Sequence, residues 1–185
     1  MSNSKITRFR DVPKFISHGS WACDYSLPFL VTTIQKWERE EDGCAPLQLN
    51  PDFQRGHVWT RSQQIAYVEF LLRGGTSGRE VYFNCPSWHT SVAVGAYDEF
   101  VCVDGLQRLT AIRRFLQNEI PVFGSKYSEY TDSLRSSTTV RVHVNDLKSR
   151  EEVLRWYLEM NAGGTPHSKK EIQRVKDLLD TEVNK

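Results

Sequence analysis

The apolar residues of the chain follow a helical spacing in five segments. In each one they recur every three or four residues, which places them on one face of a helix. The clearest segment begins at Thr60, which has the capping-box spacing to Gln63, and it ends before Gly74 and Gly75. We predict helices that start at Ser26 and are ended by Gly43, that run over 60–73, 106–116 and 151–160, and that start again at Ser168.

Other segments have the composition of β-strands. They are rich in aromatic and β-branched residues, or alternate between apolar and polar positions, and they are flanked by turn formers. We predict strands at 80–84, 99–103, 120–123 and 140–144, a short extended piece at 46–49 and a hairpin-like excursion at 85–98. The alternation of helices with strands predicts a mixed α+β domain rather than a helical bundle.

The polar segments set the expected limits of this domain. Residues 1–25 show no sustained period and are predicted to form a loosely held N-terminal arm, with residues 26–185 as the folded domain. Residues 124–139 are predicted to be a mobile polar loop, since eight of the sixteen are Ser or Thr and almost none can anchor a core.

Composition narrows the class of protein. A chain of 185 residues with 39% apolar and 25% charged residues is ordinary for one soluble domain. The longest apolar runs are far shorter than the roughly 20 residues that a membrane-spanning helix needs, and the N-terminus lacks a signal-peptide pattern. We therefore expect a cytoplasmic protein with no membrane segment.

Cysteine spacing and net charge give no indication of a zinc site or of a charged partner. The four cysteines stand far apart, without the paired spacing of a zinc site, and are expected to be free and mostly buried thiols. The formal net charge is +1, so charge by itself favours neither a nucleic-acid partner nor an acidic one.

The stretch VCVDGLQRLT (101–110) runs from a strand directly into a helix. The strand ends on Asp104, Gly105 permits a tight turn, and the first N–H groups of the helix then point outward. These amides and the guanidinium of Arg108 suit a phosphate, while Asp104 suits a bound Mg²⁺ or a proton taken from an attacking hydroxyl. The structural alternative makes Asp104 the N-cap of the helix and Arg108 its surface ion-pair partner.

Two further segments combine polar side chains with aromatic residues or glycines. In NPDFQRGHVW (50–59), the polar side chains Asp52, Gln54, Arg55 and His57 stand beside Phe53 and Trp59, a combination typical of ligand-binding loops. In NAGGTPHSKKE (161–171), Asn161, Gly163 and Gly164 would let the backbone approach a ligand closely. The alternatives are a cap with packed aromatics for the first segment and a plain interhelical turn for the second.

In this order, the three segments resemble the DGQQR-motif family of the ParB/sulfiredoxin-like superfamily, which occurs in GmrSD-type restriction systems. The family has an FQRxxVW block, a strand ending in DGQQR followed by LTxxxxF, and a later block near NxGGTPLSxxE. The corresponding blocks here are FQRGHVW (53–59), DGLQRLT (104–110) with Phe115, and NAGGTPHS (161–168) with Glu171. The resemblance spans about residues 26–180. Leu106 replaces the first glutamine of the motif, and His57 stands where an aromatic residue is common.

The resemblance implies a ParB/sulfiredoxin-like domain, a small mixed sheet surrounded by helices, that binds ATP or GTP with Mg²⁺. The implied phosphate and metal end of the site consists of Asp104, Gly105, Gln107, Arg108 and Thr110. Arg55, with Asp52 and Gln54 nearby, would face the same cleft, which Asn161, Gly163 and Gly164 would close. Asp52, His57 and Trp59 are expected to contact the substrate or to support the site.

The implied activity is an NTP-dependent phosphotransferase of phage or bacterial DNA metabolism, with a hydroxymethylated base in DNA as acceptor. Asp104 would activate the acceptor hydroxyl or hold Mg²⁺, and Arg108 and Arg55 would neutralise charge on the transferred phosphoryl group. A second hypothesis is the NTPase or sensor half of a modification-dependent restriction system whose nuclease is a separate chain, since the sequence shows no HNH-like cluster. A third is a DNA-binding adaptor without catalysis.

Overall fold

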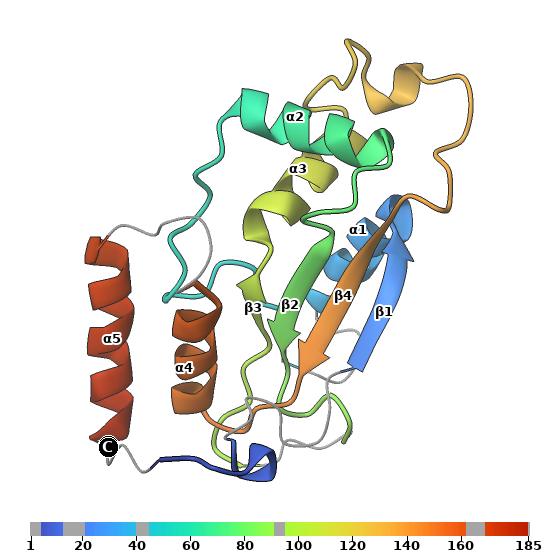
Figure 1. The fold of residues 1–185 in the computed structure, drawn as a ribbon. Helices are drawn as coiled ribbons and strands as arrows, with labels where there is room; N and C mark the ends of the chain where they lie inside the picture. The colour runs from blue at the N-terminus through green and yellow to red at the C-terminus, as the bar shows by residue number, and fades with distance from the viewer. Residues whose placement is uncertain (1–4, 13–20, 40–44, 91–94, 162–168, 185) are drawn as a thin grey trace.

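The computed structural model describes residues 5–12, 21–39, 45–90, 95–161 and 169–184. Within these residues the chain forms a mixed sheet of four strands with five α-helices around it (Figure 1). The elements are β1 (Trp21–Ser26), α1 (Leu27–Trp37), α2 (Arg61–Leu72), β2 (Glu80–Asn84), β3 (Val101–Asp104), α3 (Leu106–Leu116), β4 (Thr139–Asn145), α4 (Arg150–Asn161) and α5 (Lys169–Val183). The predicted α+β class is confirmed.

The strands lie in the order β1-β4-β2-β3. β4 is antiparallel to β1 and parallel to β2, and β2 is antiparallel to β3. Their register aligns Ala22, His143, Tyr82 and Asp104 in one row across the sheet. Since residues in register share a face of a sheet, Asp104 ends a row that also presents Tyr82 and His143.

The helices bury apolar surface in three clusters. α1 covers one face of the sheet, where Leu30 and Ile34 join Phe83 and Val142 in the main core (Figure 1). α4 and α5 pack beside β3 and around Phe53. A third cluster joins α2 to α3 and contains Val68, Ala111 and Phe115. The junction of β3 and α3 therefore lies between the cluster around Phe53 and the cluster that joins α2 to α3.

The first strand lies inside the segment predicted to be an arm. Residues 21–25 pair with residues 140–144 of β4 and belong to the sheet, so a strand lies where an arm was predicted. β1 is an edge strand whose residues are half-buried or exposed. Its sequence therefore lacks the strong apolar alternation that marks a strand with one buried face.

Two predictions about the segment after α3 are wrong. Residues 120–123 form no strand: Ile120 and Val122 are buried against α2 and α3, and the chain turns at Phe123, where φ is +49°. The loop that follows does have core anchors, because Tyr127 and Tyr130 pack edge-on against Phe115. The apolar residues of 120–123 thus pack on helices instead of forming a strand. The prediction for the loop was based on its Ser/Thr content and did not consider the two tyrosines.

The remaining elements agree closely with the sequence. α1 begins where predicted but ends at Trp37, and Glu38 there accepts two hydrogen bonds from Arg113 of α3. The extended piece at 46–49 is confirmed as a bridge between Gln48 and Val101. Residues 40–44 and 91–94, which include the predicted stop at Gly43 and part of the predicted excursion, lie outside the described residues.

The structure also bears on the apolar character of the helices and on the burial of the cysteines. None of the helices in the described ranges combines the length and apolar character needed to cross a bilayer. The thiols of Cys85 and Cys102 are buried, and that of Cys23 is exposed. Cys44 lies outside the described residues.

Candidate functional site

The junction between β3 and α3 requires glycine at position 105. Gly105 has φ of +117°, in the left-handed region that disfavours other residues. A Cβ atom there would also stand 2.6 Å from Cγ1 of Val81 on the neighbouring strand. Gly105 is itself the N-cap residue of α3, which receives no side-chain cap. The first-turn N–H groups of α3 thus have no acceptor from a capping side chain.

The three polar segments meet in one small cavity beside this junction. Asp104 at the end of β3, Arg55 from the 50–59 loop and Asn161 at the end of α4 line the same space. The other lining residues are Gln54, Val103, Leu106, Gln107 and Tyr157. The volume is about 50 Å³, which exceeds the ~10–15 Å³ that a single water needs. It is large enough for a group like one phosphate and too small for a whole nucleotide.

Asp104 is paired with Arg108 one helical turn later. Nη2 of Arg108 donates to Oδ2 of Asp104. The Asp104 side chain is 41% exposed and that of Arg108 is 21% exposed, so the pair lies at the surface of the site. Nε of Arg108 is buried and has no hydrogen-bond partner in the described part of the chain. The ion pair of the structural alternative is therefore present, while the N-cap it assigned to Asp104 is Gly105.

Arg55 is the cation that lines the cavity, since Arg108 is not among the described lining residues. It is half-buried, and it makes no hydrogen bond or ion pair that the structure records among the described residues. Its charge lies near the phenol of Tyr157: burial raises the pKa of Tyr157 to about 12, and Arg55 opposes that rise. Tyr157 thus keeps its proton at neutral pH, and the cavity contains a positive charge and a neutral phenol.

Two glutamines predicted to contact nucleotide instead hold the loop in place. Oε1 of Gln107 accepts from the backbone N–H groups of Val58 (2.9 Å) and Trp59 (3.0 Å), and its Nε2 donates to the Gly56 carbonyl (2.7 Å). Nε2 of Gln54 donates to the Cys102 carbonyl of β3 at 2.6 Å. These bonds fix the 54–59 segment against β3 and α3, which is how Arg55 comes to face Asp104.

Two other predicted residues are also engaged with the backbone. The hydroxyl of Thr110 donates to the Leu106 carbonyl at 2.7 Å, one turn back in α3. Nδ2 of Asn161 donates to the Tyr157 carbonyl at 2.7 Å. Asn161 lines the cavity, and Thr110 does not. Gly163 and Gly164, predicted to close the site, lie outside the described residues.

The remaining predicted residues lie away from the cavity. Asp52 accepts two hydrogen bonds from Nη2 of Arg150, at 2.6 and 2.7 Å, so its charge is directed to α4 instead of the cleft. His57 contacts Gln64 at the start of α2, and burial and the nearby Arg114 lower its pKa. Trp59 packs against the ring of Tyr67, with centroids 5.3 Å apart. The sequence proximity of Asp52 and Arg55 therefore does not bring both to one site.

Beside Asp104, the sheet carries two polar side chains that the sequence motifs did not indicate, Tyr82 and His143. Tyr82 and His143 stack with ring centroids 4.6 Å apart, next to Asp104 in the same row. Burial, and then a hydrogen bond to Glu80, raise the pKa of Tyr82 to about 12. The signal was present in the sequence, because Glu80 and Tyr82 occupy the polar phase of one strand and His143 that of another.

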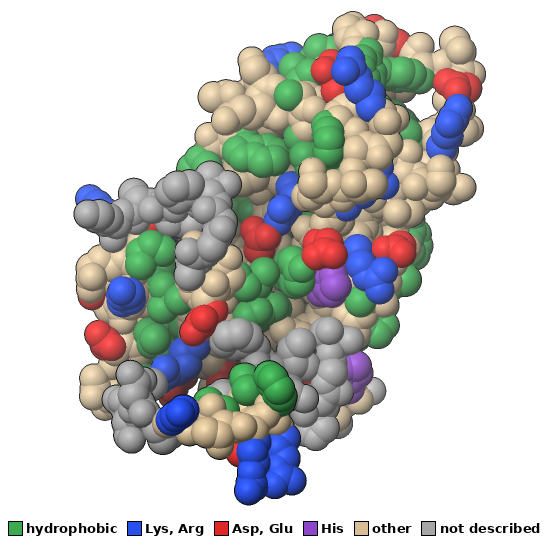
Figure 2. Space-filling model, in the orientation of Figure 1, with side chains coloured by type: hydrophobic (Ala, Val, Ile, Leu, Met, Phe, Trp, Pro, Cys, Tyr) green, Lys and Arg blue, Asp and Glu red, His purple; other side chains and the backbone are tan. Residues whose placement is uncertain are grey.

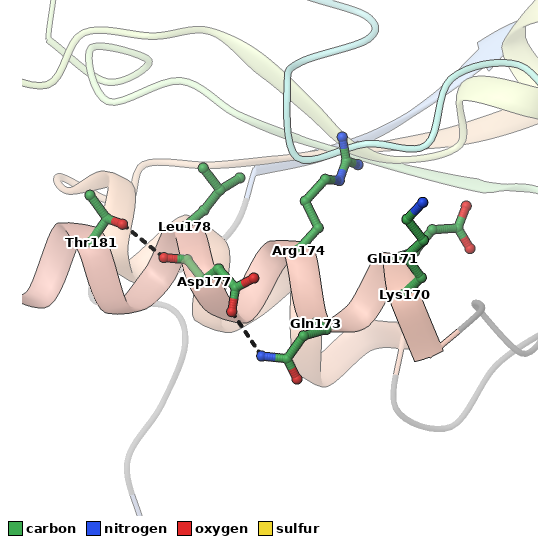
Figure 3. A pocket seen from close by; sticks show the side chains of 7 residues that line it. All are labelled: Lys170, Glu171, Gln173, Arg174, Asp177, Leu178 and Thr181. Carbon is green, nitrogen blue, oxygen red and sulfur yellow. Dashed lines mark hydrogen bonds between the residues drawn. The ribbon is translucent and has the colours of Figure 1, made fainter.

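A larger cavity of about 620 Å³ lies along α5 and is separate from this site. Its described lining comes from α5 alone: Lys170, Glu171, Gln173, Arg174, Asp177, Leu178 and Thr181 (Figure 3). Gln173 and Thr181 both hydrogen-bond to Asp177 along the helix, and Arg174 reaches across to the carbonyls of Phe53 and Gln54. Because these polar groups already bind one another, the small cavity at Asp104 is the better candidate.

Comparison with known proteins adds no relative. No model of a protein family matches the chain, and no curated protein matches it at a significant level. The assignment to the DGQQR-motif family, and with it the ParB/sulfiredoxin-like fold, accordingly stays a prediction from three sequence blocks.

Proposed function

We propose that the chain binds the phosphates of ATP or GTP at the Asp104 cavity and transfers a phosphoryl group to a hydroxyl acceptor. The observation that carries this proposal is that Asp104, Arg55 and Asn161, from segments far apart in sequence, line one cavity at the start of α3. These are the three segments that carry the resemblance, and their meeting at one cavity is what a shared binding site would require.

The proposed phosphate group lies between Arg55 and the first turn of α3. The N-terminus of a helix attracts anions through its free N–H groups and its dipole. Arg55 adds a guanidinium that has no recorded partner among the described residues and whose planar fork matches phosphate oxygens. A single phosphate-sized group fits the volume, so the rest of the nucleotide extends out of the cavity.

Mg²⁺ fits this site only as a shared ion. Among the described residues no three His, Cys, Asp or Glu side chains gather as a metal cluster, and Asp104 is the one carboxylate of the cavity lining. Mg²⁺ commonly takes one or two carboxylates and completes its shell with phosphate oxygens and water. When bound, it would neutralise charge on the phosphates, with Asp104 as its ligand from the protein.

The chain's own groups have distinct roles in the proposed transfer. The acceptor oxygen forms a bond to the terminal phosphorus while the bond from phosphorus to the bridging oxygen breaks, and the nucleoside diphosphate leaves with that electron pair. The hydroxyl proton passes to the carboxylate of Asp104. Arg55 and Arg108 stabilise charge on the moving phosphoryl group, and Arg108 also orients Asp104 through their ion pair.

The direct test combines binding with a search for product. Radiolabelled ATP and GTP are titrated with and without Mg²⁺, and the protein is then incubated with DNA that contains hydroxymethylated bases. We expect Mg²⁺-dependent binding and label transferred to the bases. Nucleotide turnover without any acceptor would instead support the NTPase half of a restriction system, whose nuclease partner is then sought by co-purification. Absence of triphosphate binding would overturn the proposal.

A further inference from the structure

A second cavity is lined by Arg108 but not by Asp104. It has a volume of about 310 Å³, at the lower end of the range of roughly 300 to 1,000 Å³ for ligand pockets. It is lined by Trp59, Tyr67, Phe70, Ser77, Gly78 and Arg108. Figure 2 shows hydrophobic side chains exposed over α2 and, below them, a basic and an acidic side chain beside each other at the start of α3.

Arg108 connects this cavity to the proposed phosphate site. Its Nη2 binds Asp104, while the same side chain lines the aromatic cavity. Its buried Nε has no hydrogen-bond partner in the described part of the chain. The phenol of Tyr67 lies near both charges: burial raises its pKa to about 12, Arg108 opposes the rise and Asp104 adds to it. A ligand in the aromatic cavity thus lies next to the Asp104–Arg108 pair.

The walls of the cavity are held in place and are accessible. The backbone of Trp59 is fixed by Gln107, and the Tyr67 hydroxyl donates to the Gly78 carbonyl at 2.9 Å. The Trp59 and Tyr67 rings meet edge to face, with an angle of 61° between their planes. Phe70 is 40% exposed. Phe70 is therefore exposed, while Trp59 and Tyr67 are partly buried and held by hydrogen bonds, and all three rings line the same cavity.

We propose that this aromatic cavity, which we call the Phe70 cavity, binds a nucleobase. The inference rests on the proposed nucleotide function, since the phosphate cavity holds only one phosphate-sized group and the remaining ligand must lie elsewhere. A planar base stacks on aromatic rings and on the guanidinium of Arg108. Ser77 and the Gly78 backbone supply polar groups at the edge of the cavity. The base belongs to the nucleoside triphosphate or to a single DNA strand that brings the acceptor.

Phe70→Ala is the main test, because Phe70 is exposed and its removal leaves the core intact. Calorimetric titrations compare three probes: ATP, inorganic tripolyphosphate and a short single-stranded oligothymidylate. Loss of stacking costs about 1 to 3 kcal/mol per base, which corresponds to a loss of affinity of about 5- to 150-fold. We expect that loss for at least one base-bearing probe and no change for tripolyphosphate. Phe29→Ala is the matched control, since Phe29 is an exposed phenylalanine of α1 outside the cavity.

The outcomes identify the source of the base and distinguish failure of the base site from failure of the proposed phosphotransferase. A loss confined to ATP assigns the cavity to the nucleotide, and a loss confined to the oligonucleotide assigns it to the DNA strand. If the unaltered protein binds tripolyphosphate as tightly as ATP and Phe70→Ala changes no probe, the base site is wrong while the phosphate site stands. If no triphosphate binds but oligonucleotide binding depends on Phe70, the proposed phosphotransferase fails and the base site survives. Trp59→Leu, from another wall, repeats the comparison.

Discussion

The side-chain oxygen of Gln107 accepts a hydrogen bond from the backbone N–H of Trp59 at 3.0 Å. The same glutamine also binds the backbone of Gly56 and Val58. One side chain of α3 therefore holds the 56–59 segment, which lies between Arg55 of the Asp104 cavity and Trp59 of the Phe70 cavity. A residue that the motif assigns to nucleotide binding has a structural role that is sufficient to explain its presence.

The first prediction concerns this contact. Gln107→Met keeps the length of the side chain but leaves the three backbone groups without their partner. We expect the free energy of unfolding to fall by about 1 to 3 kcal/mol, the usual cost of unpaired polar groups at a partly buried site. Urea denaturation measures it. Gln117→Met is the control, because Gln117 is an exposed glutamine at the C-terminal end of the same helix. If the free energy of unfolding falls only as much as in the control, the 56–59 segment is held by other contacts.

The second prediction separates the two arginines of the proposed site. Arg55→Ala is expected to weaken ATP binding by about 1.5 to 3 kcal/mol, the size of a lost hydrogen bond to a charged group, without a measurable loss of stability. Arg108→Ala is expected to weaken binding as much and also to destabilise the fold, because it removes the partner of Asp104. Calorimetry and thermal unfolding measure the two effects.

The matched control is Arg135→Ala, an exposed arginine in the loop before β4. Equal ATP affinity in the Arg55, Arg108 and Arg135 variants would contradict the proposed phosphate site.

The sequence predicted those parts of the fold that depend on neighbours in the chain. The capping box at Thr60, the glycine turn at Gly105 and the strand before it are local features, and all three are present. The edge strand β1 was missed because its own residues show no strand pattern. It is a strand because it pairs with β4, which lies far away in the sequence. Asp52 was misplaced for a related reason, because its partner Arg150 lies 98 positions later in the sequence.

The candidate site was predictable in part. The shared location of Asp104, Arg55 and Asn161 followed from the three-block pattern. Sequence reasoning did not reveal that Gln107 uses its amide on the backbone, because a glutamine beside an arginine suits either role. Nor did it reveal the Phe70 cavity. Phe70 lies in the capped helix α2, and its contact with the cavity depends on how α2 packs against α3.

The third prediction addresses the turn that positions Asp104. Gly105→Ala places a Cβ at a φ of +117° and 2.6 Å from Val81. Backbone strain costs about 1 to 2 kcal/mol, and the forced contact adds about 1 to 3 kcal/mol. Gly74→Ala is the control, since Gly74 has a φ of +87° with no atom within 4 Å of the added Cβ. Urea denaturation should show a loss at position 105 that exceeds the loss at 74 by the contact contribution. Equal losses would show that Val81 moves aside freely.

The fourth prediction uses the titration of His143 on the open sheet face. Burial, and to a lesser degree Arg141, lower its pKa below 6.5, and Glu80 opposes this. The unfolded chain then binds the proton more tightly than the folded protein. Above about pH 7 the ring is neutral in both states and costs nothing, whereas below its unfolded pKa, near 6.5, protonation favours unfolding. The folded protein thus loses stability as the pH falls from about 7 to about 5.

His143→Gln removes this proton-binding site and should make the free energy of unfolding less dependent on pH over the same range. Urea denaturation at several pH values measures the slope, and the difference between the two proteins isolates His143 from His57, whose lowered pKa acts in the same direction. His89→Gln is the control for removing an exposed imidazole from another part of the chain. The same slope with and without His143 would mean that its ring gains protons as readily in the folded sheet as in water. Its stack on Tyr82 would then not shield it from solvent.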